Sequence, residues 1–326
     1  MRFNLGRTLI AALLLAGAYA DAQAQQFPSR PIRMVIAFPA GGPTDFVGRL
    51  LADKMKDALG QAVVIENKPG ANGAIGADYV AKSEPDGHTI FLTTVGAVAI
   101  TPNMRPDLPY NTLRDFAPVS LVVRNTTILV VKPDMPANSA KDLAAMAKQK
   151  PGAIPFASTG VGSMPHLALE LFQSAADVKF VHVPYRGAAP ALTDLLGGQV
   201  QAVFLDLPVL MAHIQSGRLK PLGAASGQRN PKLPNVATLI EQGYPNTVCD
   251  NWYGLLAPAK TPPAIIARLN AALLAAMNDP GVRGKLIESG AVPSPTTPAE
   301  FGQLLKDELA RWGDVVRAKG IKESPG

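Results

Sequence analysis

Two glycine-rich turns of the 326-residue chain carry the residue types best suited to chemistry. The first, Phe38–Asp45, reads FPAGGPTD, and the second, Ser158–His166, reads STGVGSMPH. Each stands between an apolar run and a helical pattern. The N–H groups at the start of a helix are unpaired and partly positive, and glycines let a ligand approach them closely. Both turns are therefore candidate anion-binding sites, although both would also serve as ordinary capped turns.

The absence of basic residues narrows the kind of anion. Neither turn contains Lys or Arg, and neither has the Lys that follows the last Gly of a phosphate-binding loop. N–H groups alone would neutralise a di- or triphosphate poorly, whereas one carboxylate suits them well. We therefore expect the ligand to be a small organic acid.

The polar side chains of these turns each allow two interpretations. The hydroxyl groups could donate hydrogen bonds to the ligand or could cap the helices; they belong to Thr44, Ser158, Thr159 and Ser163. Asp45 could interact with the helix dipole, or it could favour an amino or amide group on the ligand.

Catalysis and metal binding have weaker support in the sequence. GVGSM does not match G-x-S-x-G, so a hydrolase would depend on a Ser163–His166 dyad. The four histidines lack the spacing of metal ligands, and the single Cys249 is expected to be a buried thiol. We predict no catalytic residue, no metal, no cofactor and no enzymatic activity.

Two residues further along the chain could complete a pocket. Tyr185, in a Pro-Tyr-Arg-Gly corner before a helical pattern, could form a wall. Asp206 ends the apolar run VQAVFLD, where a parallel strand presents side chains to a cleft. Its carboxylate could accept a hydrogen bond from a ligand N–H or O–H group, or could cap the segment from Pro208 onward.

The alternation of apolar β-branched runs with helical patterns predicts parallel βαβ units. The strand, glycine turn and helix sequence occurs near residue 40 and again near residue 160, which favours two lobes that share a cleft. We place 25–124 and 250–326 in the first lobe and 125–249 in the second. We expect strands at 32–38, 62–67, 89–94, 154–159 and 251–259, a loop after residue 94, and helices at 46–59, 165–176, 263–277, 280–289 and 298–319.

The first 24 residues have the features of a secretory signal peptide. Arg2 and Arg7 precede the apolar run TLIAALLLAGAYA, and AQA at 22–24 predicts cleavage near Ala24–Gln25. No later segment looks membrane-spanning. The formal net charge of +6 is scattered along the chain, so we expect no nucleic-acid surface.

Six segments together resemble the Bug family, the periplasmic solute receptors of tripartite tricarboxylate transporters. They are PIRMVIAFPAGGPTD, ENKPGANGAIGADYVAKSEPDGHTI, ASTGVGSMPHLALELF, VHVPYRGAAPALTDLLGGQVQAVF, LPNVATLIEQGYP and NWYGLLAPAKTPPAIIARLN. The resemblance implies a two-lobe α/β type II periplasmic binding protein fold with the ligand in the interlobe cleft. It also implies a periplasmic monomer that captures an amino acid, dicarboxylate or aromatic acid for the membrane subunits of such a transporter. The alternative is a periplasmic sensor that binds the same solutes and feeds a signalling protein.

The resemblance places the ligand carboxylate at the two glycine turns and polar contacts near Asp206. In the third-strand loop, Val98 stands near a position where relatives often have His, which favours an apolar or aromatic distal end for the ligand. The ligand-binding residues that we predict are Phe38, Ala40, Gly41, Gly42, Thr44, Asp45, Thr93, Ser158, Thr159, Gly160, Gly162, Ser163, His166, Tyr185 and Asp206.

Overall fold

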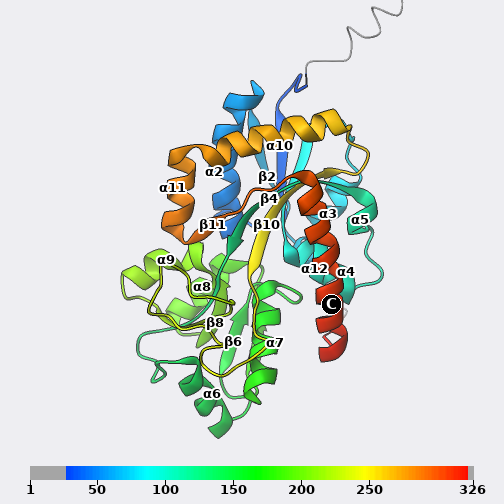
Figure 1. The fold of residues 1–326 in the computed structure, drawn as a ribbon. Coiled ribbons are helices and arrows are strands. Elements are labelled where there is room, and N and C mark those ends of the chain that lie inside the picture. The colour runs from blue at the N-terminus through cyan, green and yellow to red at the C-terminus, as the bar shows by residue number, and fades with distance from the viewer. Residues whose placement is uncertain (1–26, 322–326) are drawn as a thin grey trace, which may run out of the picture.

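The computed structural model describes residues 27–321, and these residues form two α/β lobes, each built on its own sheet (Figure 1). The predicted signal peptide lies outside the described residues. The first sheet has the strand order β11-β4-β10-β3-β1-β2. Its strands are β1 (Ile32–Ile36), β2 (Val63–Asn67), β3 (Thr89–Thr94), β4 (Phe116–Asn125), β10 (Asn251–Pro258) and β11 (Ala291–Pro293).

The second sheet has the order β7-β6-β8-β5-β9. Its strands are β5 (Thr127–Val131), β6 (Pro155–Ser158), β7 (Val181–Pro184), β8 (Ala202–Asp206) and β9 (Lys220–Ala224). In both sheets the βαβ strands are parallel, as predicted, and the connecting strands β5 and β10 run antiparallel to their neighbours.

Apolar residues alternate along the strands and so divide the helices between the sheet faces. In β1, Ile32, Met34 and Ile36 pack in a cluster with α2 (Pro43–Leu59), α10 (Pro263–Asn278) and α11 (Pro280–Ser289). Val35 joins the cluster on the opposite face, with α3 (Ala74–Ala81) and α12 (Pro298–Lys319). In the second sheet, Ile128 and Val130 face α8 (Ala188–Gly197) and α9 (Leu207–Gln215). The alternate residues face α6 (Ala140–Gln149) and α7 (Met164–Ala176).

Two neighbouring strands connect the lobes. β4 leads into β5 of the second sheet, and β10 brings the chain back (Figure 1). They pair antiparallel with Asn125 opposite Asn251 at the passage between the lobes. The chain then ends in helices that pack on the first sheet, as the sequence predicts.

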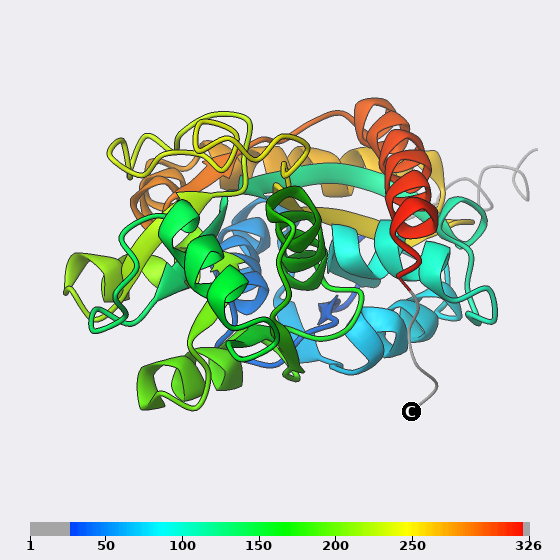
Figure 2. The same ribbon diagram turned by 90° about the horizontal axis from the view of Figure 1, so that it is seen from below.

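The segment after β3 is helical, so the prediction of a loop there is wrong. It contains the π-helix η2 (Gly96–Ile100) and α4 (Thr101–Met104), followed by the one-turn helix α5 (Thr112–Asp115). All five residues of η2 are buried, and α12 packs against both η2 and α4 (Figure 2). Its helical form thus depends on a segment about 200 positions later, which a local pattern cannot reveal.

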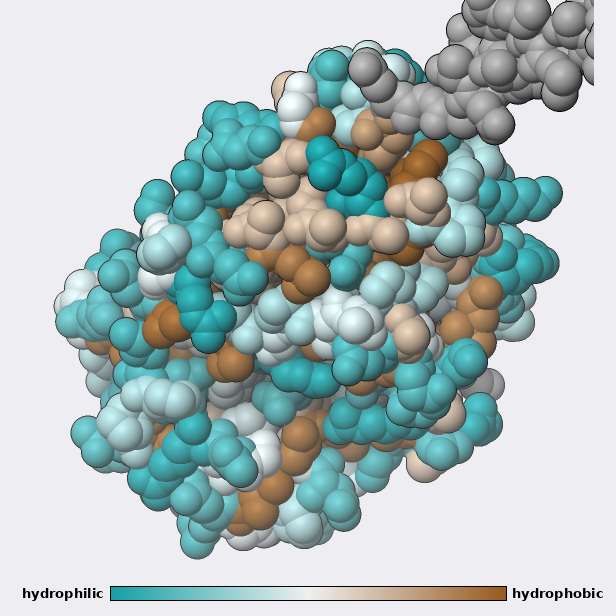
Figure 3. All heavy atoms as spheres, turned by 45° about the horizontal axis from the view of Figure 1, so that its top comes forward, coloured by the Kyte–Doolittle hydropathy of each residue, from teal (hydrophilic) through white to brown (hydrophobic). Residues whose placement is uncertain are grey.

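The surface shown in Figure 3 is hydrophilic over most of its area, and hydrophobic residues gather mainly in the upper part of the view, with smaller groups elsewhere. Among residues 27–321, no helix combines the length and the apolar character that crossing a membrane requires.

Candidate functional site

A cavity lies between the two lobes. Its empty volume is about 580 Å³ when the part that opens to solvent is included. The ends of strands and the starts of helices from both lobes form its wall. Its lining contains no Lys or Arg. The lining residues are Phe38, Pro39, Ala40, Gly42, Pro43, Thr44, Asn72, Thr94, Thr159, Ser163, Met164, Pro165, Gly187, Ala188, Ala189, Leu205, Asp206, Asn251 and Tyr253.

The start of α2 gives the cavity a set of backbone donors. Gly42 is the N-cap and contributes no side-chain cap, and Pro43 follows it at the first helical position. The first hydrogen bond of the helix runs from Phe46 N to Gly42 O, 3.0 Å. The helix therefore leaves the N–H groups of Thr44 and Asp45 without a helical acceptor, and Gly42 and Thr44 line the cavity.

Asp45 supports this turn from behind and does not line the cavity. Its Oδ2 accepts hydrogen bonds from Gly41 N (3.0 Å) and Arg49 Nε (2.8 Å), and its Oδ1 accepts one from Asn67 Nδ2 (3.1 Å). Burial opposes ionisation of the carboxyl, but the bonds from Arg49, Gly41 and Asn67 outweigh it and lower the pKa of Asp45. Asp45 is thus an ionised brace for the turn.

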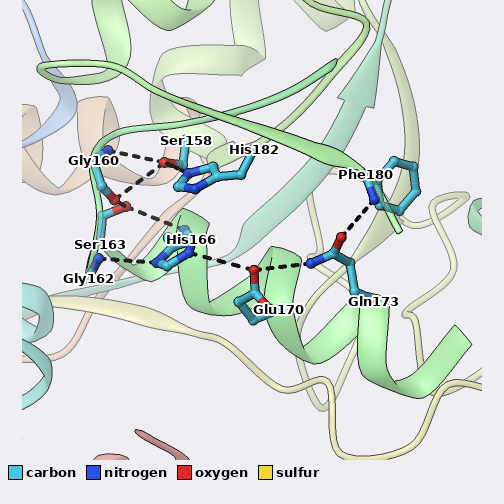
Figure 4. A network of polar contacts seen from close by, with 9 residues as sticks. All are labelled: Ser158, Gly160, Gly162, Ser163, His166, Glu170, Gln173, Phe180 and His182. Carbon is cyan, nitrogen blue, oxygen red and sulfur yellow. Dashed lines mark hydrogen bonds and ion pairs between the residues drawn. The ribbon is translucent and has the colours of Figure 1, made fainter. Parts of the chain in front are cut away.

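The second glycine turn uses most of its donors within itself (Figure 4). Ser163 is the N-cap of α7: its Oγ accepts from His166 N (3.4 Å) and donates to Gly160 O (2.6 Å). Ser163 N also donates to Gly160 O (3.2 Å). Because Pro165 has no N–H, the first turn of α7 has only the N–H of Met164 left for a ligand.

Two stacked histidines hold this turn in place (Figure 4). The rings of His166 and His182 lie 4.3 Å apart at 11°. Gly162 N donates to His166 Nδ1 (3.2 Å), and His182 Nε2 lies 2.6 Å from Ser158 Oγ. Burial lowers the pKa of His166 to about 3 and also lowers that of His182, so both rings are neutral at pH 7.

This geometry does not support the dyad of a hydrolase. His166 Nδ1 accepts the N–H of Gly162, and Ser163 Oγ bonds only to the main chain. The thiol of Cys249 is buried, and burial raises its pKa to about 12. Within residues 27–321, no group of three His, Cys, Asp or Glu side chains could hold a metal ion.

The start of α8 provides further backbone N–H donors to the cavity. The sequence analysis did not identify this helix start as a candidate anion-binding site. α8 begins after Gly187, which provides no side-chain cap, and its first residues Ala188 and Ala189 line the cavity. Gly187 has φ 130°, and a Cβ there would lie 3.3 Å from the Pro39 ring of the first lobe. The sequence signal was present, since a Gly with no capping side chain precedes the helix.

Asp206 lies at the junction of the lobes and is 5% exposed. Its Oδ2 accepts hydrogen bonds from Tyr253 OH and from Asn251 Nδ2 (2.8 Å). Thr127 Oγ1 lies 3.5 Å from Oδ1. Burial raises the pKa of Asp206 to about 6, and the bonds from Tyr253, Asn251 and Thr127 offset this only in part. The chain of polar contacts continues from Tyr253 to Thr44 at the start of α2.

A direct hydrogen bond also joins the lobes across the cavity. Asn72, in the short helix η1 (Ala71–Gly73), donates from Nδ2 to Gly162 O (2.7 Å) and to Thr101 Oγ1 (2.9 Å). Asn72 has φ 47°, in the left-handed region that Asn tolerates better than most residues. The side chain therefore connects the first lobe to the second glycine turn.

The predicted site residues fall into three groups. Seven line the cavity: Phe38, Ala40, Gly42, Thr44, Thr159, Ser163 and Asp206. Gly160 and Tyr185 line an adjoining opening of the cleft, together with Arg186, Phe38 and Thr159. Six line neither space: Gly41, Asp45, Thr93, Ser158, Gly162 and His166.

Thr93 illustrates a difference of one residue. It is fully buried, and its neighbour Thr94 lines the cavity because side chains alternate along β3. The sequence analysis also missed Asn72, Asn251 and Tyr253. Asn251 and Tyr253 are two residues apart on β10 and therefore lie on the same face of the strand. The sequence does not show which face of β10 lies toward the cavity, so it could not identify them as site residues.

Comparison with known proteins gives one consistent result. Residues 47–321 match the family model described as tripartite tricarboxylate transporter family receptor, TctC. Protein BugT of Bordetella pertussis is 40% identical over 308 residues, which cover 94% of each chain. The solved structure of the periplasmic binding protein BugD has a TM-score of 0.87 at 34% identity and covers 91% of this chain and 100% of its own. An R. palustris protein solved with adipate has a TM-score of 0.87 at 33% identity and covers 91% and 99%.

Proposed function

Because the chain belongs to the tripartite tricarboxylate transporter receptor family, whose members are periplasmic solute-binding proteins, we propose that it captures a small organic carboxylate and delivers it to membrane subunits of such a transporter. The observation that carries the proposal is the pair of helix starts, α2 and α8, that meet the cavity with no capping side chain. A carboxylate matches these N–H groups in charge and size.

The composition of the cavity supports a carboxylate over a phosphate. A phosphate carries up to two charges, and no Lys or Arg lines the cavity to neutralise them. The R. palustris relative was solved with adipate, a dicarboxylate, which agrees with a carboxylate over a phosphate.

We propose a division of labour among the predicted residues. Gly42 and Thr44 of the first lobe and Ala188 and Ala189 of the second contact the carboxylate, while Asp206 contacts another part of the ligand. Tyr185 holds the rim of the adjoining opening, where its OH donates to Asp194 Oδ2 (2.6 Å). Five of the residues that line neither space act by holding the two turns in position: Gly41, Asp45, Ser158, Gly162 and His166. The sixth, Thr93, is buried in β3 and belongs to neither turn.

We also propose the remaining features that the sequence and the family suggest for this chain: export by cleavage near Ala24–Gln25, division between the lobes at 124/125 and 249/250, and action as a monomer with no cofactor. The cleft would close over its solute, and the closed form would be the one that the membrane subunits recognise.

A thermal-shift screen of the purified protein tests the ligand class. The panel contains adipate, benzoate, nicotinate and glutamate, with inorganic phosphate and benzyl alcohol as controls. A carboxylate at about 100 times its Kd should raise the free energy of unfolding by about 2.7 kcal/mol. A shift with phosphate or the alcohol and with no carboxylate would contradict the proposal.

The transport role needs a second experiment. Deleting the gene for the chain should stop cellular uptake of the carboxylate found in the screen, and supplying the gene from a plasmid should restore it. Unchanged uptake in the deletion strain would argue against delivery to a transporter.

A further inference from the structure

Two amide oxygens in the cavity wall have no hydrogen-bond partner. They are Oδ1 of Asn72 and Oδ1 of Asn251, and both atoms are buried. Asn251 as a whole is only 6% exposed. Five further buried side-chain atoms of the described residues lack a hydrogen-bond partner, but none of them belongs to a residue that lines this cavity. Buried polar atoms in folded proteins are nearly always hydrogen-bonded, so the two oxygens of cavity-lining residues are candidate contacts for a ligand.

The orientation of both amides is fixed by what their nitrogens contact. Asn251 Nδ2 donates to the carboxylate of Asp206 (2.8 Å). Asn72 Nδ2 donates to the carbonyl oxygen of Gly162 (2.7 Å), which can only accept. Turning either amide around would place oxygen against oxygen. The free atom is therefore the oxygen in both residues, and it can only accept a hydrogen bond.

Asp206, which lines the same cavity, adds a third acceptor. Its Oδ2 is taken by Tyr253 and Asn251, whereas Oδ1 has only the contact with Thr127 at 3.5 Å. The donors that the cavity offers are the N–H groups at the helix starts and the hydroxyl groups of Thr94 and Thr159. One carboxylate can use the N–H groups. A second carboxylate would leave the acceptor oxygens unpaired and would face Asp206 with no Lys or Arg in the lining to neutralise it.

We propose that the ligand is a carboxylate with a second, uncharged nitrogen group, such as a primary amide, whose two N–H atoms bind two of the three Oδ1 atoms, that of Asn251 among them. This inference rests on the proposed carboxylate receptor and narrows its ligand class. Each pairing replaces an unsatisfied buried oxygen, which costs about 1–3 kcal/mol, with a hydrogen bond.

Two sets of three probes test this inference. Within each set, the probes share one carboxylate and one carbon skeleton and differ only in the group at the other end. The first set is succinamate, monomethyl succinate and succinate, and the second is 4-carbamoylbenzoate, monomethyl terephthalate and terephthalate. Isothermal titration should show that in at least one set the amide binds about tenfold or more tightly than both the ester and the dicarboxylate. An ester or a dicarboxylate that binds as tightly as the amide would overturn the inference but leave the carboxylate receptor intact. Failure of all six probes to bind, together with no shift for any carboxylate in the thermal-shift panel, would contradict the proposed function itself.

Asn251→Ala isolates the contribution of one oxygen. The variant should reduce the preference for the amide over the ester by about tenfold or more while ester affinity changes little. Asn125→Ala is the matched control, because Asn125 is the cross-strand partner of Asn251, is fully buried and does not line the cavity. This control should keep the preference of the unmodified protein. An unchanged preference in Asn251→Ala would remove Asn251 from recognition, and if that variant does not fold, the ratio in the unmodified protein still decides the question.

Discussion

The two glycine turns look alike in sequence and differ in what they leave free. Both follow a parallel strand and both open a helix that contains proline in its first turn. In the first turn the N-cap is Gly42, and Asp45 holds the loop from the side away from the cavity. In the second turn the N-cap is Ser163, and its side chain, with His166, occupies the donors and acceptors of the loop.

The difference shows that the capping residue decides whether a helix start can serve a ligand. A serine cap satisfies the N–H group that an anion would use, whereas a glycine cap leaves it open. In the second lobe this role passes to α8, which also begins after a glycine. Four predictions test this contrast, from the largest expected effect to the smallest.

Asp45→Ala should have the largest effect. It removes the acceptor of the Gly41 N–H and one of the two acceptors of the Asn67 amide, whose other bond runs to Phe38 O (3.0 Å). We expect the unfolding free energy to fall by roughly 3 kcal/mol and carboxylate affinity to fall more than tenfold. Denaturant melts and titration calorimetry measure the two quantities. Asp53→Ala on the exposed face of α2 is the control. Unchanged ligand affinity in Asp45→Ala would show that binding at the first turn does not depend on the hydrogen bonds to Asp45.

Acid should weaken the second turn before it weakens the first. The pKa of His166 is lowered to about 3, so its neutral form stabilises the fold above pH 6.5, and this stability is lost as pH falls from 6.5 toward 3. The pKa of Asp45 is also lowered, but its contribution is lost only below pH 3.8. At pH 5 we expect His166 to account for roughly 2 kcal/mol of lost stability.

Comparing the unmodified protein with His166→Gln by denaturant melts at pH 7.5 and pH 5 measures this difference. His213→Gln on α9 is the control for loss of a histidine elsewhere. Equal pH dependence in all three proteins would mean that the stacked histidines do not determine the acid response.

Ala189→Pro should weaken binding without unfolding α8. The substitution removes one N–H from the cavity wall at the second helical position, where that group has no helical acceptor. Carboxylate Kd should rise roughly tenfold, because a hydrogen bond to a charged group is lost. Ala299→Pro, at the second position of α12, is the matched control and should bind normally. Equal carboxylate affinity in both variants would exclude the start of α8 as a contact for the carboxylate.

Ser163→Ala should have the smallest effect on the ligand. Removing the cap should lower unfolding free energy by about 1 kcal/mol, a typical value for an N-cap serine. Carboxylate Kd should change by less than about threefold, because the capping oxygen bonds to the main chain of its own turn. A large loss of affinity with little loss of stability would instead show that Ser163 contacts the ligand.

Much of the fold was readable from local patterns. β3 spans Thr89–Thr94 as predicted, and α11 and α12 have the predicted bounds. Such features depend on residues close together in sequence. The segment after β3 was misread because its helical form depends on packing against α12.

The site was predictable only in part, for a similar reason. The first turn was identified correctly as a helix start beside the cavity, since glycine, proline and threonine at that spacing define it locally. Asn72 and Asn251 come from distant segments, and only the folded chain brings them to one wall. Which of two neighbours on a strand faces the cavity, as with Thr93 and Thr94, also depends on how the sheet is oriented.

The helix starts of α2 and α8 have a consequence for how such a protein can change over evolution. A seat made of main-chain N–H groups survives almost every point mutation, since only proline removes an N–H. The side chains around the seat are free to vary while the carboxylate contact persists. A lineage can therefore exchange one cargo for another by small steps, each of which keeps a working receptor.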